Sequence, residues 1–125
     1  MRQVQETISI QTRRQGNHDI SRDVTGWVER QGIETGLLIV FLQHVSAHLT
    51  VQEHADRDDL MTYFQRLEYR PTSDYGEFTS PVTSVQLSIP VTGGRIALGA
   101  RQRIYLHEHR ETPQKRSLVL HLLGE

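Results

Sequence analysis

Residues 36–42 read Gly-Leu-Leu-Ile-Val-Phe-Leu, and this apolar run decides the fold. A short continuous apolar run that ends in polar residues is typical of a buried strand. The predicted strand spans residues 36–44. Because its apolar residues are nearly continuous rather than alternating, we expect both of its faces to be covered.

Polar, titratable residues follow this strand directly. Residues 43–56 read Gln-His-Val-Ser-Ala-His-Leu-Thr-Val-Gln-Glu-His-Ala-Asp. Imidazole can bind a metal, carry a proton or pair with an anion near neutral pH, so His44 is a candidate site residue. On one straight strand His44 and His48 would be roughly 13 Å apart, too far to share a metal ion unless the chain bends near residues 46–47. We therefore expect His48 and His54 to be surface or interface groups.

The rest of the chain predicts one helix before this strand, a second helix after it and several further strands. Residues 4–10 alternate as a strand does, although Glu6 interrupts the apolar side. A helical face recurs through residues 20–28, with Asp19 or Ser21 as the N-cap and Gly32 as the C-terminal cap. A second helix is expected over 56–67 and a long loop over 68–83. Further strands are expected over 85–91, 95–99, 101–109 and 118–122, with a hairpin turn at 92–94. The sequence therefore predicts a single α+β domain, 1–125, in which two main helices pack on a mostly antiparallel sheet.

Composition narrows the functional classes. The 125 residues carry a net charge of −1, which disfavours nucleic acid as a partner. The absence of cysteine excludes disulfides and cysteine-bound zinc. We find no secretory signal and no run of membrane-spanning length, so we expect a cytoplasmic protein without a membrane partner. The modest apolar content, 36%, suggests that part of the buried surface is supplied between subunits.

A second polar motif lies at 105–110, which reads Tyr-Leu-His-Glu-His-Arg. His107 and His109 are two residues apart, so on a strand they share one face and can coordinate one metal ion. The alternative is a pair of solvated histidines. Arg110 has the planar fork that binds phosphate or carboxylate, and its alternative is a surface ion pair with Glu108 or Glu111.

These motifs together resemble the YjbQ-like family of small bacterial and archaeal proteins. Residues 44–56 resemble the family stretch His-Thr-Ser/Thr-Ala-x-Leu-Thr-x-Asn-Glu-Asn-x-Asp. Residues 87–91 and 94–110 resemble Leu-Thr-Ile-Pro-Val followed by Gly-Arg-Leu-Ala-Leu-Gly-Thr-Trp-Gln-Gly-Ile-Tyr-Leu-x-Glu-His-Arg. The similarity covers most of the chain.

The resemblance implies an α+β homotrimer with sites near subunit boundaries and a weak, secondary thiamine phosphate synthase activity. His44, Glu53 and His109 match family positions that we associate with catalysis, and Ser46 and Arg110 are assigned to ligand binding. The candidate metal ligands are His44, His107 and His109, with zinc or a similar divalent metal as the candidate cofactor.

The chain also departs from the family pattern. Relatives carry a His-x-x-Asp-Asp-Met-Pro-Ala-His-Ile segment, whereas residues 73–83 here are shorter and contain no histidine. His48, His54 and His107 are extra relative to the usual motifs, and either they rebuild the site or the site has decayed. We therefore favour a trimer that binds a small anionic ligand with little or no catalysis. The alternative is a metal-assisted enzyme of the thiamine phosphate synthase type that acts on phosphorylated small molecules.

Overall fold

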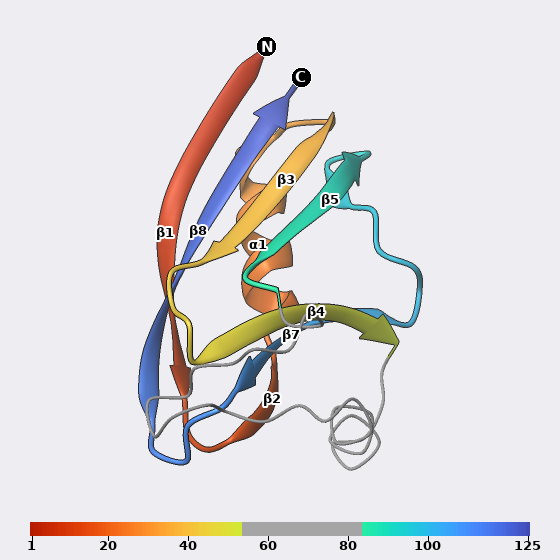
Figure 1. Cartoon of the computed structure of the whole chain (residues 1–125). Helices are drawn as coiled ribbons and strands as arrows, with labels where there is room; N and C mark the ends of the chain where they lie inside the picture. Colours follow the sequence, from red (N-terminus) through yellow and green to blue (C-terminus); the bar gives the residue numbers. More distant parts are fainter. Residues whose placement is uncertain (54–83) are drawn as a thin grey trace.

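The computed structural model describes residues 1–53 and 84–125, which form one α-helix and eight β-strands (Figure 1). The elements are β1 (Arg2–Thr12), β2 (Gly16–Asp19), α1 (Ser21–Gln31), β3 (Thr35–Leu42), β4 (Ala47–Glu53), β5 (Gln86–Thr92), β6 (Arg95–Ile96), β7 (Gln102–Glu108) and β8 (Gln114–Gly124). The predicted second helix and long loop, 56–83, lie outside the described residues. The predicted mainly antiparallel α+β fold is confirmed for the remainder.

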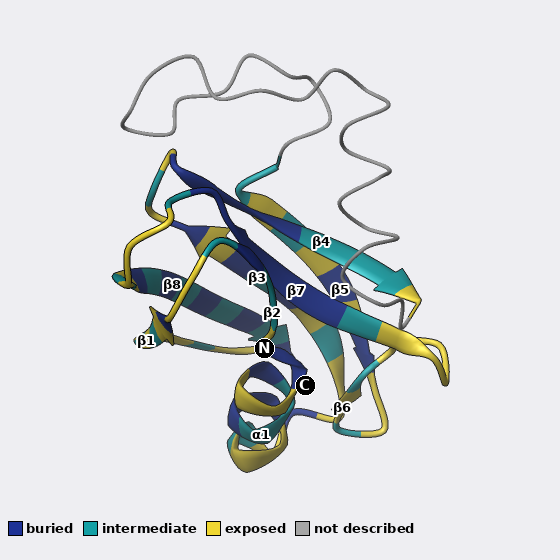
Figure 2. Cartoon of the chain, turned by 90° about the horizontal axis from the view of Figure 1, so that it is seen from below, coloured by how far each residue is buried: buried dark blue, intermediate teal, exposed yellow. Residues whose placement is uncertain are grey.

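The strands form two antiparallel sheets. The larger has the order β1-β8-β3-β5-β6, and the smaller has the order β2-β7-β4. In Figure 1, α1 lies behind the larger sheet, while β4 and β7 run across its lower end. Buried residues from α1 and from both sheets form one apolar core, as the burial colours of Figure 2 show.

Local sequence patterns explain β1 and α1. Glu6, which interrupts the β1 alternation, accepts a hydrogen bond from the indole N–H of Trp27, 3.3 Å away. This polar side chain on the inward side of β1 therefore has a partner.

The predicted helical face of α1 is buried, and Gly32 ends the helix at φ 68°. The predicted N-cap is wrong, because Ile20 occupies that position. The Asp19 carboxylate instead accepts the backbone N–H of Ser21, the first helical residue.

The apolar strand β3 is covered on one face only. Leu38, Val40 and Leu42 are fully buried, whereas Leu37 and Phe41 are 38% and 44% exposed. The expectation that both faces are covered is therefore wrong within one chain. The reason is that α1 packs on the inner face alone, and nothing in the described residues covers the outer face (Figure 1).

The chain turns between β3 and β4, and the strand predicted over 36–44 ends at Leu42. Residues 43–46 connect the two sheets, with β3 in one and β4 in the other. This turn separates the environments of His44 and His48. Later strand boundaries also shift: the predicted strand 95–99 shortens to the two residues of β6, and β8 is longer than predicted. Within the two described segments, no helix is long and apolar enough to cross a bilayer.

Candidate functional site

A cavity of about 690 Å³ opens where the β3–β4 connection meets the ends of β7 and β8. It is lined by Phe41, Leu42, Gln43, His44, Val45, Ser46, Val85, Arg110, Gln114 and Arg116. Three of the predicted site residues, His44, Ser46 and Arg110, therefore line one hollow. Arg110 is distant in sequence from His44 and Ser46. The two segments meet because β3 and β8 are paired neighbours in the larger sheet.

His44 is held as a neutral ring. Its Nε2 accepts the backbone N–H of Ser117 at 3.0 Å, which places the ring proton on Nδ1. Burial lowers the pKa of His44, and the positive charge of Arg116 lowers it further, while Glu108 acts in the opposite direction. At neutral pH the imidazole can therefore offer Nδ1–H as a hydrogen-bond donor to a ligand.

A buried ion pair supports the cavity wall. Arg116 donates from Nε to Oε1 of Glu108 at 2.9 Å and from Nη2 to Oε2 of the same carboxylate. Thr12 Oγ1 donates to Oε1 at 2.7 Å, and the backbone N–H of Arg110 donates to Oε2 at 3.2 Å. Burial alone would raise the pKa of Glu108, but the hydrogen bonds from Arg116, Thr12 and Arg110 outweigh it and hold that pKa below its usual value.

Arg116 also ties this pair to the β3–β4 connection. Its Nη2 donates to the carbonyl of Ser46 at 3.1 Å, and the backbone N–H of His109 donates to the same carbonyl at 3.2 Å. Ser46 thus links the cavity wall to the end of β7. Because the pair is 0–4% exposed at its side chains, it fixes the position of the connection that carries His44.

Three imidazoles gather beside this junction, and we call them the histidine cluster: His48, His107 and His109. His48 and His107 are direct cross-strand partners of β4 and β7, and His109 follows two residues later on the same side. The ring centroids are 4.7–5.1 Å apart in all three pairs. His48 Nδ1 and His109 Nε2 are 2.7 Å apart, so one ring donates a hydrogen bond to the other.

Burial keeps two rings of this cluster uncharged. Burial, and secondarily His107, lowers the pKa of His48 to about 3. Burial, His48 and Arg116 lower the pKa of His109 to about 2. His48 and His109 are therefore neutral imidazoles at neutral pH. Within 1–53 and 84–125, no three His, Cys, Asp or Glu side chains are already arranged to hold a metal ion.

The structure redistributes the predicted site residues. It groups His107 and His109 with His48 and places His44 in the cavity instead. Both members of the predicted His-x-His pair are buried, so the alternative of solvated histidines is wrong. The prediction that His48 is a surface or interface group is also wrong, since the residue is 1% exposed within a single chain.

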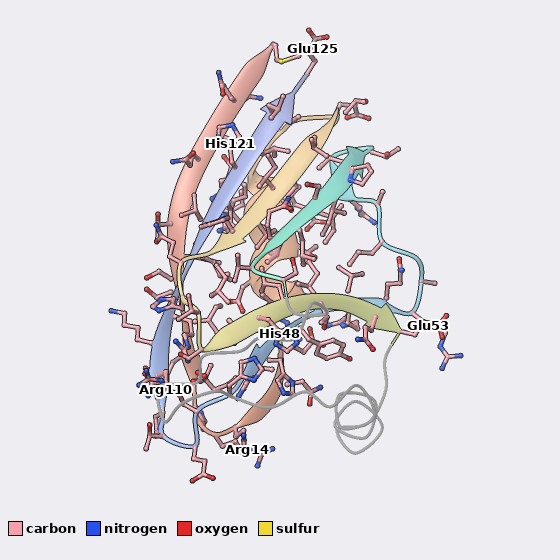
Figure 3. All side chains as sticks on the ribbon, in the orientation of Figure 1. Arg14, His48, Glu53, Arg110, His121 and Glu125 are labelled. Carbon is pink, nitrogen blue, oxygen red and sulfur yellow. The ribbon has the colours of Figure 1, made fainter. Side chains whose placement is uncertain are left out.

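Glu53 lies apart from these groups. It is exposed at the far end of β4, five residues from His48, which is roughly 16 Å along a strand. Figure 3 shows Glu53 at one tip of β4 and Arg110 beyond the other. Within one chain Glu53 does not orient a histidine of the cluster. His54 lies outside the described residues.

Sequence reasoning missed Glu108 and Arg116 as site residues, and it left open whether His48 helps to rebuild the site. A signal for Arg116 is present, because it alternates in phase with the buried leucines at 118, 120 and 122. Glu108 lies between two histidines that share the opposite face, which predicts that its side chain points toward the core. For His48 no local signal exists, since its burial depends on pairing with β7.

The two antiparallel sheets, the helix behind the larger one and the cavity at the sheet junction define a small α+β protein with a polar site at a strand connection. The model of the "UPF0047 protein YjbQ-like" family matches residues 6–125, and the chain belongs to this family. It is 34% identical over 138 residues to UPF0047 protein sll1880 of Synechocystis, covering 99% of this chain and 94% of that protein. It is 33% identical over 135 residues to UPF0047 protein YjbQ of Salmonella typhimurium, covering 97% and 98%.

Solved structures share the fold. A YbjQ-like protein of unknown function from Sulfolobus solfataricus superposes with a TM-score of 0.83 at 24% identity, covering 99% of both chains. The conserved hypothetical protein TT1486 of Thermus thermophilus gives a TM-score of 0.74 at 28% identity, covering 94% of this chain and 99% of that one. These likenesses support the architecture described above.

Proposed function

We propose that this protein binds a small anionic molecule in the cavity at the sheet junction, and that it does so as a homotrimer. The observation that carries the proposal is the convergence of His44, Ser46 and Arg110 on one hollow of about 690 Å³. A hollow of this size matches the usual range of small-molecule sites.

The charge of the cavity favours an anion. We assign the ligand's charged group to Arg110, which is half-buried and lines the cavity. Among the described residues, the lining includes no aspartate or glutamate that would repel an anion. A guanidinium donates two parallel hydrogen bonds to phosphate or carboxylate, and these bonds strengthen when water is partly excluded.

The remaining lining favours a ligand with an apolar part. Phe41, Leu42, Val45 and Val85 all contribute to the cavity. A phosphorylated or carboxylated molecule with a ring or short hydrocarbon would contact both halves of the lining. Such a division between a few polar anchors and an apolar wall is typical of small-molecule pockets.

Replacing Arg110 with methionine is expected to weaken binding of phenyl phosphate by about 10–100-fold, since a hydrogen bond to a charged group contributes about 1.5–3 kcal/mol. Isothermal titration calorimetry on untagged, chelator-treated protein provides the measurement. Wild-type protein should bind phenyl phosphate more tightly than inorganic phosphate, because only the former contacts the apolar wall.

Arg14→Met is the matched control, because Arg14 is exposed and does not line the cavity. It should leave the affinity unchanged. Equal losses in the two arginine variants would show that phenyl phosphate binds by general surface charge. An absence of binding to the wild-type protein at millimolar phenyl phosphate would contradict the proposal.

The outer face of the larger sheet supports the proposed trimer. On it the exposed Leu37 and Phe41 lie opposite Leu123 and Val119 of β8, so an apolar strip runs along two neighbouring strands. An apolar patch on a sheet face without cover is typical of a protein–protein contact. Because Phe41 also lines the cavity, the site would lie beside the boundary between subunits.

Replacing Leu37 with glutamate is expected to convert the assembly to monomers at micromolar concentration, because an unpaired charge would be buried in the contact. Because Leu37 does not line the cavity, this variant changes the proposed subunit contact and leaves the cavity residues as they are. Light scattering should give three times the 14.4 kDa chain mass for wild type and for the control Arg22→Glu on the exposed side of α1. A monomeric wild type would refute the trimer.

The metal-assisted transferase remains the alternative. Transfer from a pyrophosphate ester normally uses Mg²⁺ held by carboxylates. No carboxylate lines the cavity among the described residues, which is why we favour binding over catalysis.

A further inference from the structure

We propose that His48, His107 and His109 form a binding site for a divalent transition metal of the zinc type, with the metal replacing the hydrogen bond between His48 and His109. The site is separate from the anion cavity, and its residues differ from the metal set that the sequence suggests. It also differs from the family motif, since His48 and His107 are both additional to it.

The spacing of one donor pair, His48 Nδ1 and His109 Nε2, suits such an ion after a small adjustment. Tetrahedral zinc with Zn–N bonds of about 2.0–2.1 Å holds its nitrogens about 3.3–3.4 Å apart. His48 Nδ1 and His109 Nε2 are now 2.7 Å apart, as hydrogen-bonded atoms are, and must separate by roughly 0.7 Å. The final torsion of a histidine side chain is broad, so rotation of the rings supplies this movement.

The backbone already holds the three rings in place. His48 and His107 are fixed by the ladder between β4 and β7, and His109 is fixed by its N–H bond to the Ser46 carbonyl. Sites on rigid strands lose little conformational entropy when they bind a ligand. The nearly equal centroid distances of 4.7, 4.9 and 5.1 Å show that no ring stands apart from the other two.

The chemistry of the donors selects the class of ion. Neutral imidazole is a ligand of Zn²⁺, Ni²⁺, Co²⁺ and Cu²⁺, whereas Mg²⁺ and Ca²⁺ prefer oxygen. Three histidine ligands leave one tetrahedral position for a fourth ligand. Metal ions require deprotonated ligands, and the neutral rings of His48 and His109 satisfy this without releasing protons.

The test measures Zn²⁺ binding to untagged, chelator-treated protein by calorimetry and by the visible spectrum of the Co²⁺ form. We expect one ion per chain, a four-coordinate Co²⁺ spectrum and a higher melting temperature with Zn²⁺. His107→Ala and His48→Ala should each weaken Zn²⁺ by about 100-fold or more, because loss of outer-shell partners alone weakens metal binding by about 10–100-fold.

His121→Ala is the control, since His121 lies on β8 and hydrogen-bonds Gln5 outside the cluster. It should bind Zn²⁺ as wild type does. His107→Gln provides a second, larger replacement if the alanine variant fails to fold. Zn²⁺ affinity that is unchanged in the folded His48 and His107 variants, or no stoichiometric binding by wild type at 100 times the protein concentration, would overturn the proposal. Phenyl phosphate binding is measured without metal. A negative result for one ligand therefore overturns the proposal for its own site and leaves the other proposal standing.

Discussion

Replacing Arg116 with methionine is expected to lower the free energy of unfolding by about 3–5 kcal/mol. The substitution leaves the Glu108 carboxylate buried with no cation beside it, and such a charge is poorly solvated. It also removes the donor that holds the Ser46 carbonyl. Urea denaturation at pH 7, followed by circular dichroism, measures the change.

Arg103→Met is the matched control, because it breaks the ion pair with Asp19 at the surface, where both side chains are more than one third exposed. Surface pairs contribute about 0–1 kcal/mol, so its effect should be small. The double variant Arg116→Met/Glu108→Gln should recover part of the loss, because it removes the uncompensated charge. If Arg116→Met and Arg103→Met lowered the free energy of unfolding equally, burial of the Arg116–Glu108 pair would not explain the effect of Arg116→Met.

Acidification is expected to destabilise the metal-free protein by about 4 kcal/mol between pH 7 and pH 5. The folded state holds His48 and His109 neutral, with pKa values of about 3 and about 2, whereas in the unfolded chain each has a pKa near 6.5. Below that value the unfolded state binds two more protons than the native state. Stability therefore falls with pH from about 6.5 down to about 3, at up to about 1.4 kcal/mol per pH unit per histidine.

The measurement is a series of urea denaturation curves from pH 7.5 to pH 5 in the presence of a chelator. His48→Gln should reduce the slope by about one proton. A wild-type stability that stays constant over this range would show that the two rings are protonated in the native state.

Much of the fold follows from local patterns. The alternation at residues 4–10, the helical face from Ile20 to Val28 and the turn at Gly93–Gly94 each predict their own element. All three are confirmed, and both turn glycines have positive φ. These signals are reliable because each reports the exposure of neighbouring residues along a single element.

The site was only partly predictable. The sequence pointed to His44, Ser46 and Arg110, which line the same cavity, and to the shared face of His107 and His109. It left open a bend near residues 46–47, but it did not place His48 beside His107, because that position depends on the pairing of β4 with β7. Arg116 is 3% exposed although it directly follows the exposed Lys115.

Periodicity along the chain alone determined which segments are strands, which face of α1 is apolar and where the titratable residues are concentrated. Only the tertiary structure decided that His48 faces His107, that Arg116 meets Glu108, and that one face of β3 stays uncovered within the chain. The physical reason is that strand register and sheet packing depend on residues far apart in sequence, and a shift by one residue would turn every side chain to the other face.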